Sequence, residues 1–131
     1  MKRFSLSHSE RVRKKKEFDS VYRKGKTIFS SDLLLKSIFT IESEVETGVQ
    51  IAAAISKKAG KAVWRNRVKR LIKEAYRLNK KIILDVAKEK KTKLLIIFTL
   101  NKLNEQSNNK LKLSDISPGV IEIIKKISQQ I

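Results

Sequence analysis

The residues best placed to do chemistry are lysines and arginines gathered in the middle of the chain. Between Ser56 and Lys80 the sequence has ten Lys or Arg residues and a single acidic one, Glu74. Arginine presents a planar fork that fits a phosphate group with two hydrogen bonds, and lysine presents a mobile point charge. Asn66 lies among them as a neutral donor and acceptor. This stretch therefore predicts electrostatic binding of a phosphate backbone.

A helix drawn through this stretch separates its charged residues from its apolar ones. At about 100° per residue, an apolar face lies within roughly 60° of Val68 and comprises Trp64, Leu71, Ile72 and Ala75. Between roughly 100° and 200° lies a stripe of polar and basic residues: Asn66, Lys69, Arg70, Lys73, Arg77 and Lys80. Glu74 falls outside the stripe. A solvated helix face usually alternates glutamate with lysine, so we interpret this stripe as a nucleic-acid contact.

The acidic residues do not indicate a catalytic centre. A nuclease with two metal ions needs carboxylates that hold the ions roughly 3.5–4 Å apart. The acids here are scattered, with Glu42, Glu44 and Glu46 in a presumed turn and Asp85 and Glu89 near a helix end. The chain has no cysteine and one histidine, His8, which argues against thiol catalysis, zinc bound by cysteine and a Ser-His-Asp triad. We expect no catalytic residue and no metal or cofactor held by the protein itself.

The overall composition is consistent with one domain and a polyanionic partner. The 131 residues, 40% of them hydrophobic, suffice for one domain of ordinary size. The net charge is +18, and self-repulsion of this kind destabilises a compact state unless a polyanion relieves it. Nucleic acid is the first candidate; a membrane surface would need a cationic helix with exposed large apolar side chains. No run of about 18 apolar residues is present, so we expect no membrane contact and a cytoplasmic location.

The apolar pattern in the first half of the chain predicts the elements that come before the stripe. Residues 1–14 are expected to form a flexible basic arm. Lys15 to Lys24 should form a helix that ends at Gly25, with Phe18, Val21 and Tyr22 on one face. Leu33 to Ile41 and Val49 to Ile55 should be strands, joined as a hairpin by an acidic turn from Glu42 to Gly48. The basic helix should run from Ala59 to about Lys80.

The second half of the chain should complete the sheet and cover it. Lys93 to Leu100 is apolar on both faces and predicts a central strand. Asn101 to Ile116 is polar and is expected to be a loop. Ser117 then provides an N-cap and Pro118 the first residue of a last helix. The order α-β-β-α-β-α predicts an α+β fold: a single-domain α-β sandwich over residues 1–131, with helices covering the sheet.

The basic stretch also carries a specific motif. The residues that form it are Lys57, Lys58, Gly60, Ala62, Val63, Arg65, Asn66, Arg67, Lys69 and Arg70. This pattern resembles the signature of the bacterial ribonuclease P protein family, often called its RNR motif. Upstream, Phe18, Val21, Tyr22 and Gly25 resemble the family's first helix, and Leu94 to Phe98 resembles its last strand. The resemblance covers roughly Leu6 to Leu100, and more loosely the final helix.

The resemblance implies a subunit of a ribonucleoprotein enzyme. Family members bind the catalytic RNA of ribonuclease P through the helix that carries the motif. Together with the stripe, this implies a set of RNA-binding residues: Lys57, Lys58, Arg65, Asn66, Arg67, Lys69, Arg70, Lys73 and Arg77.

The resemblance also implies that the single-stranded 5′ leader of precursor tRNA lies in a cleft between the first helix and the sheet, beside Phe18 and Tyr22. The RNA hydrolyses the phosphodiester bond with magnesium ions, so the protein alone should be inactive. The family fold further implies a left-handed βαβ crossover, where a right-handed one is the general rule.

Some interpretations stay open at this point. Phe18 and Tyr22 could be core residues instead of stacking platforms, while Trp64 is expected to be an anchor on the apolar face. The chain departs from the family's usual residues at Lys36, Ala52, Ala54, Thr99 and Asn101, which affects the expected leader contacts along the sheet. The alternative function is that of a structural RNA-binding protein such as a ribosomal protein, since composition alone does not separate the two.

Overall fold

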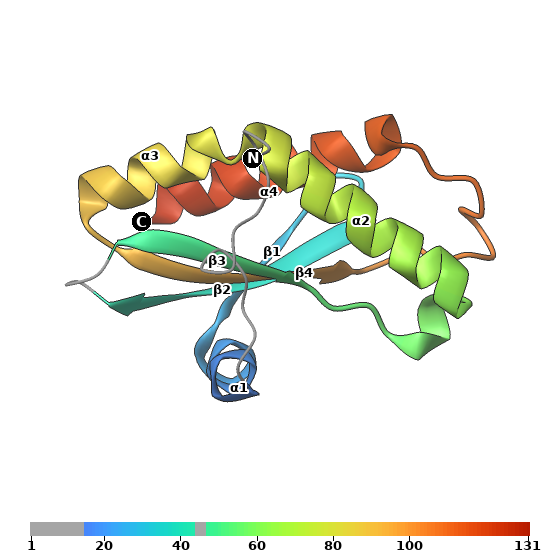
Figure 1. The fold of residues 1–131 in the computed structure, drawn as a ribbon, viewed down its shortest axis with the longest axis horizontal. Coiled ribbons are helices and arrows are strands. Elements are labelled where there is room, and N and C mark those ends of the chain that lie inside the picture. Colours follow the sequence, from blue (N-terminus) through green and yellow to red (C-terminus); the bar gives the residue numbers. More distant parts are fainter. Residues whose placement is uncertain (1–14, 44–46) are drawn as a thin grey trace, which may run out of the picture.

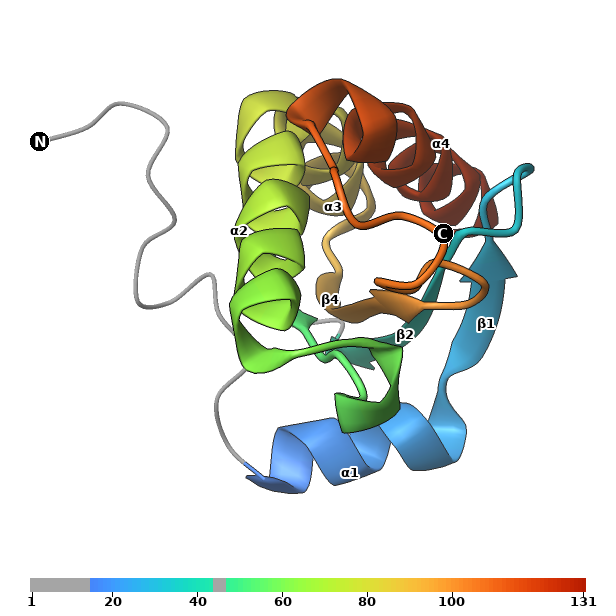
Figure 2. The same ribbon diagram turned by 90° about the vertical axis from the view of Figure 1, so that its right-hand side faces the viewer.

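The chain folds into one four-stranded sheet with helices on both faces (Figures 1 and 2). The computed structural model describes residues 15–43 and 47–131. In chain order the elements are α1 (Lys15–Lys24), β1 (Lys26–Phe29), β2 (Leu35–Ser43), β3 (Gly48–Ala53), the short 3-10 helix η2 (Lys57–Ala59), α2 (Ala62–Asn79), α3 (Lys81–Lys90), β4 (Lys93–Leu100) and α4 (Leu113–Gln130). Helices α2, α3 and α4 cover one face of the sheet and α1 lies on the other. The predicted α+β class is confirmed. The expected basic arm, residues 1–14, lies outside the described residues.

The strand order is β1-β2-β4-β3, which confirms one prediction and contradicts another. Strand β4 is central, as predicted, and pairs antiparallel with β2 and parallel with β3. The predicted hairpin between β2 and β3 is wrong, because β4 lies between them. The physical reason is that Leu94 to Phe98 are all buried, so β4 needs a strand at each edge and cover on each face.

The true hairpin joins β1 to β2, and the sequence analysis missed β1. Its four residues pair antiparallel with β2, from Lys26 opposite Phe39 to Phe29 opposite Lys36. Only Ile28 of this edge strand is buried, so the strand has little apolar pattern. The turn that follows contains Leu33 in a left-handed conformation, with a φ of 63°.

The helices after β3 also differ from expectation. Helix α2 ends at Asn79 and α3 follows almost at once, where no separate helix was predicted. Helix α3 buries Ile83 and Ala87, ends at Lys90 and is capped by Lys91, whose φ of 53° is left-handed. No helix within the described residues is long and apolar enough to cross a membrane.

The last helix begins at Leu113, so its predicted start at Ser117 and Pro118 is wrong. The amide of Lys112 donates to the Asp115 carboxylate over 2.8 Å, and this bond caps the first turn. Pro118 therefore lies inside the helix, where it gives up one backbone hydrogen bond. Burial of Ile116 and Val120 on either side of it offsets that loss.

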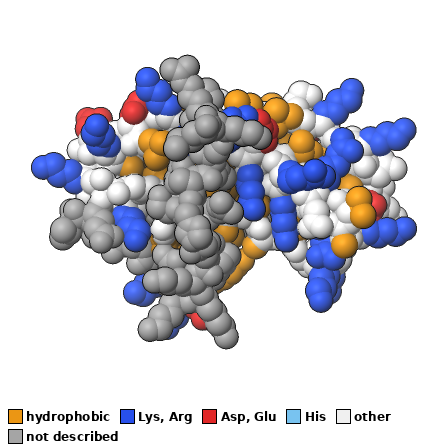
Figure 3. Space-filling model, in the orientation of Figure 1, with side chains coloured by type: hydrophobic (Ala, Val, Ile, Leu, Met, Phe, Trp, Pro, Cys, Tyr) orange, Lys and Arg blue, Asp and Glu red, His pale blue; other side chains and the backbone are white. Residues whose placement is uncertain are grey.

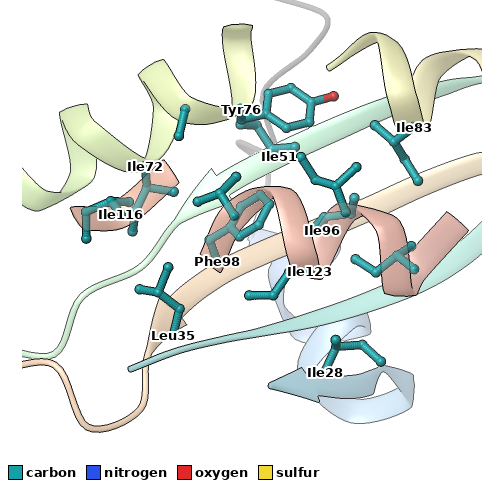
Figure 4. Packing of buried hydrophobic residues seen from close by; sticks show 14 of the residues in the cluster. Ile28, Leu35, Ile51, Ile72, Tyr76, Ile83, Ile96, Phe98, Ile116 and Ile123 are labelled. Carbon is teal, nitrogen blue, oxygen red and sulfur yellow. The ribbon is translucent and has the colours of Figure 1, made fainter. Parts of the chain in front are cut away.

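The main core lies between the sheet and helices α2 to α4 (Figure 4). Ile72 and Tyr76 of α2, Phe98 of β4 and Ile123 of α4 are among its fully buried side chains. The rings of Tyr76 and Phe98 lie 6.3 Å apart between centroids. A smaller cluster on the other face joins Val21 of α1 to Ala52, Leu95 and Ile97 of the sheet. Helix α2 is thus anchored in the larger of the two cores.

Gly25 ends α1 as predicted, and close packing explains why it must be glycine. Its amide donates to the carbonyl of Val21 over 2.8 Å. A Cβ on Gly25 would lie 2.3 Å from both Ile38 Cγ2 and the Val21 oxygen. The chain therefore enters β1 pressed against β2, and no side chain fits at this position.

The β1–β2 turn is fastened to α4 by a carboxylate. The Ser31 amide donates to both oxygens of Glu122, over 2.9 and 3.1 Å, and the Ser31 hydroxyl donates to Glu122 as well. Lys126 Nζ lies 3.0 Å from Glu122 Oε2 and also donates to the Phe29 carbonyl. The hydrogen bonds from Ser31, with help from Lys126, lower the pKa of Glu122 from 4.5 to about 2.

The hydrogen bonds of Glu122 predict that Glu122→Gln lowers the unfolding free energy by an amount that depends on pH. Because folding lowers the pKa of Glu122, the stabilisation is complete above pH 4.5 and is lost as the pH falls toward 2. Glu122 is partly exposed, so we expect a deficit in unfolding free energy of about 1 kcal/mol or less at pH 7. Urea unfolding should show a smaller difference from the unsubstituted chain at pH 3. A deficit that does not change with pH would contradict the assignment, and Glu89→Gln on α3 is the control.

Candidate RNA-binding surface

Helix α2 presents the two faces that its sequence predicts. Trp64, Val68, Ile72 and Ala75 are buried, and Leu71 is half-buried against the same core. Of the predicted stripe, Asn66 and Arg70 are exposed and Lys69, Lys73, Arg77 and Lys80 are partly exposed. Arg65 and Arg67 lie nearer the edges of the apolar face, where Arg67 is exposed and Arg65 is partly exposed. In Figure 3, Lys and Arg side chains gather on the right-hand part of the molecule, where η2, α2 and the loop between β4 and α4 lie in Figure 1. The structure thus brings the predicted basic residues of α2 to the surface together.

The two lysines before α2 extend this surface. Lys57 and Lys58 lie in η2 and are exposed. Ser56 caps this short helix, because its hydroxyl accepts a hydrogen bond from the Lys58 amide over 3.2 Å. The motif is therefore split between η2 and the first half of α2, joined at Gly60 and Lys61.

Two arginines of the motif are tied to the protein's own backbone. Arg65 Nε donates to the Gly60 carbonyl over 3.0 Å, and the Arg67 guanidinium donates to the Leu111 carbonyl. A guanidinium has five N–H donors, so one such bond orients the side chain and leaves donors for a phosphate. These arginines are held in place, and only part of each guanidinium can face a ligand.

One acidic residue, Glu74, interacts with the stripe, although the helical projection places it outside. Glu74 forms an ion pair with Arg77 three residues later, with Arg77 Nε donating to Glu74 Oε2 over 2.9 Å. Both side chains line an open groove with Arg67, Arg70, Leu71 and Lys73. The hydrogen bond to Glu74 raises the pKa of Arg77. The projection places Glu74 outside the stripe, but long side chains one helical turn apart reach each other, so an acid does interact with the stripe at this end.

Of the two aromatic side chains predicted on α1, the structure describes that of Tyr22 but not that of Phe18. The Tyr22 side chain is 52% exposed, while its neighbour Val21 is buried against the sheet. Tyr22 is therefore a surface residue. Phe18 lies in α1, but its side chain is outside the part of the chain that the structure describes.

The sheet carries a row of further side chains on the α1 side. Strand register places Phe29 opposite Lys36 and Lys36 opposite Thr99. These residues share the face of Ile38 and Ile97, which pack near Val21 of α1, because alternate residues of a strand point the same way. Phe29 is 42% exposed. An aromatic and a cation thus lie side by side on this face, and the sequence analysis missed Phe29 because it missed β1.

The remaining polar residues offer no metal site in the described parts, 15–43 and 47–131, where no three His, Cys, Asp or Glu side chains come together. Asp85 and Glu89 are exposed on α3. Glu44 and Glu46 lie outside the described residues, as does the side chain of Glu42.

Comparison with known proteins agrees with the family that the motif resembles. The family model described as Ribonuclease P matches residues 6–116. The ribonuclease P protein component of Clostridium botulinum is 40% identical over 116 residues, which cover 88% of this chain and 92% of that protein. The corresponding protein of Clostridium novyi is 46% identical over 74 residues, covering 56% and 64% of the two chains.

Solved structures share the fold. The ribonuclease P protein from Thermotoga maritima superposes with a TM-score of 0.72 at 20% identity, covering 89% of this chain and 96% of that one. The Staphylococcus aureus ribonuclease P protein gives a TM-score of 0.68 at 23% identity, covering 90% and 94%. The sequence matches favour the ribonuclease P interpretation of the motif over the ribosomal alternative. Since the matched region holds α1, the whole sheet and the basic surface of η2 and α2, the chain belongs to the bacterial ribonuclease P protein family.

Proposed function

We propose that this protein binds two RNAs on two separate surfaces. As a family member it is the protein subunit of ribonuclease P, the ribonucleoprotein endoribonuclease that takes part in 5′ processing of tRNA. The proposal assigns the catalytic RNA to the basic surface of η2 and α2, and the leader of precursor tRNA to the side of the sheet that carries α1.

The basic surface carries the first assignment. A folded RNA presents phosphates and 2′-hydroxyls at fixed positions, which suits a rigid row of cations. The α2 helix is rigid because Trp64, Val68, Ile72 and Ala75 are buried beneath it. We propose contacts to the catalytic RNA from Lys57, Lys58, Arg65, Asn66, Arg67, Lys69, Arg70, Lys73 and Arg77. Arg77 is expected to contribute least, because Glu74 already neutralises it.

The α1 side suits a single strand. Unpaired bases expose faces that stack on aromatic rings, at roughly 1–3 kcal/mol for each base. We propose that Phe18 and Tyr22 stack leader bases. The exposure of Tyr22, and the neighbouring row of Phe29, Lys36 and Thr99 on the same side of the sheet, support this assignment.

The remaining parts of the proposal follow from the family resemblance. Residues 1–131 act as one RNA-binding domain in the cytoplasm. The catalytic RNA carries out hydrolysis with magnesium ions, and the protein supplies binding surfaces. The crossover from β3 through α2 and α3 to β4 has the left-handed sense of the family.

The first test is reconstitution. Purified protein free of RNA should leave precursor tRNA intact in the presence of magnesium. When a bacterial catalytic RNA is added at low magnesium, the chain should increase the rate of leader removal well above that of the RNA alone. Gel analysis of 5′-labelled precursor tRNA reports both. Specific 5′ cleavage by the RNA-free protein, abolished by substitution of Glu42, Glu44 and Glu46 together, would contradict the proposal.

The second test measures how salt weakens binding to the catalytic RNA. Each lost phosphate contact reduces the slope of log affinity against log salt by about 0.7–0.9, so Arg70→Ala with Lys73→Ala should reduce it by about 1.5. Lys81→Ala with Lys88→Ala on α3 is the matched control, because it removes the same charge from exposed positions outside the stripe. Equal slopes for the stripe variant and the unsubstituted chain would show that Arg70 and Lys73 contact no phosphate.

The third test separates the two surfaces. Phe18→Ala with Tyr22→Ala should weaken binding of precursor tRNA by the assembled enzyme about tenfold or more, because stacking on the leader is lost. Binding of mature tRNA, which has no leader, should stay nearly unchanged. Tyr22→Ala alone should show a smaller effect of the same kind, and circular dichroism should confirm that both variants are folded. Ile41→Ala, which trims another exposed apolar side chain, is the control. Equal losses for precursor and mature tRNA would refute the assignment of the leader to α1.

A further inference from the structure

The start of α2 lacks a cap of its own. Its N-cap residue is Lys61, which makes no side-chain capping bond, and its first turn has no acidic residue. The first amides of a helix have no partner within the helix, and its N-terminus carries a partial positive charge. Lys57, Lys58 and Arg65 add cations close by in the chain. By local chemistry this is an unfavourable place to begin a helix.

The missing acceptor comes from a distant part of the chain. Glu105 Oε1 accepts a hydrogen bond from the Lys61 amide over 2.8 Å, although the two residues are 44 positions apart. The Glu105 amide donates to the Ala59 carbonyl, also over 2.8 Å. Glu105 therefore holds the end of η2 and the start of α2 at the same time, one on each side of Gly60.

Gly60 allows this close approach. A Cβ there would lie 2.7 Å from Glu105 Cβ and 2.8 Å from Trp64 Cε3, which is too near for any side chain. The glycine of the motif thus has a packing role in this chain. It lets the loop that carries Glu105 press against the junction of η2 and α2.

The loop itself, residues 101–112, is well anchored. Leu103 and Leu111 are buried in the main core. Trp64 Nε1 donates to the Asn108 carbonyl over 2.9 Å, and Arg67 donates to the Leu111 carbonyl. Glu105 is therefore presented by a fixed support, and the loop clamps the motif at Lys61, Trp64 and Arg67.

The loop also shapes the surface beside the motif. A polar hollow of about 220 Å³ has one wall formed by Ser56, Lys58 and Ala59 and the other by residues 99–101 with Leu103 and Asn104. The bond from the Glu105 amide to the Ala59 carbonyl joins these two walls. This is a backbone bond, so it joins the two walls whichever side chain stands at position 105, and the side chain of Glu105 adds the bond to Lys61.

We propose that Glu105 is a positioning residue that holds η2 and the start of α2 in the one geometry that fits the catalytic RNA. This inference rests on the proposed function of the basic surface. A carboxylate beside an RNA-binding surface repels phosphate, so its charge alone weakens binding to any RNA. Its hydrogen bonds, in contrast, favour the RNA whose phosphates match the held geometry. Glu105 therefore lowers general affinity and raises specificity.

The experiment compares the full-length chain binding to a bacterial catalytic RNA and to poly(U), for three substitutions of Glu105. Glu105→Ala removes the side-chain bond to the Lys61 amide and the charge but keeps the backbone bond to Ala59, so catalytic RNA binding should weaken about fivefold, the equivalent of one lost helix cap, while poly(U) binding stays equal or tightens. Glu105→Gln keeps an acceptor oxygen, so catalytic RNA binding should be retained and poly(U) binding should tighten. Glu105→Asp keeps the charge but withdraws the oxygen, so catalytic RNA binding should weaken with no gain for poly(U). Glu89→Gln, which removes an exposed acid on α3, should change neither.

Each other outcome has a definite meaning. Unchanged binding of both RNAs in Glu105→Ala and Glu105→Asp would overturn the inference. Parallel weakening of both RNAs, with a lower thermal midpoint, would also overturn it, since that is the signature of general destabilisation. The pair Lys57→Ala with Lys58→Ala separates the two proposals: if that variant binds the catalytic RNA normally, the surface assignment itself fails. If it binds weakly while the Glu105 variants bind normally, only the role of Glu105 fails.

Discussion

Burial of the apolar face of α2 is the interaction on which the rest of the structure depends. Val68, Ile72 and Tyr76 are fully buried, and Tyr76 contacts Phe98 of the central strand. Burying each large side chain contributes about 1.5–3 kcal/mol, which fixes the rotation of the helix about its axis. Once that rotation is set, the basic residues must face outward, because they occupy the opposite side of the same helix. The position of the cations is therefore decided by the core.

The second theme is how a chain with a net charge of +18 uses its few acids. In the described parts several carboxylates accept hydrogen bonds from backbone amides, two of them from a distant segment and one at the start of its own helix. Glu122 joins the β1–β2 turn to α4, Asp115 caps α4, and Glu105 joins the β4–α4 loop to α2. Hydrogen bonds from backbone amides to a carboxylate are stronger than those between neutral groups. The acids thus stabilise the scaffold, while most of the basic surface stays available to a polyanion.

The sheet keeps the two proposed RNA surfaces apart. Helices α2 to α4 cover one face, and the main core lies beneath them. Among the described residues, the other face carries α1 and a small cluster around Val21, and Phe29 and Tyr22 are exposed there. A thinly covered face suits a single strand that needs access to aromatic rings, and a thickly covered face supports a rigid helix.

The sequence alone determined the features that follow from the period of the apolar residues and from the motif. Helical periodicity defined the two faces of α2, the run from Leu94 to Phe98 identified a central strand, and the motif from Lys57 to Arg70 indicated the family. The tertiary structure decided the pairing of β2 with β1 and β4, the internal bond of Arg67 and the cap that Glu105 provides. Each of these depends on segments that meet only after folding. Periodicity reports which side of an element is apolar, but it carries no information on which distant backbone groups will need a partner.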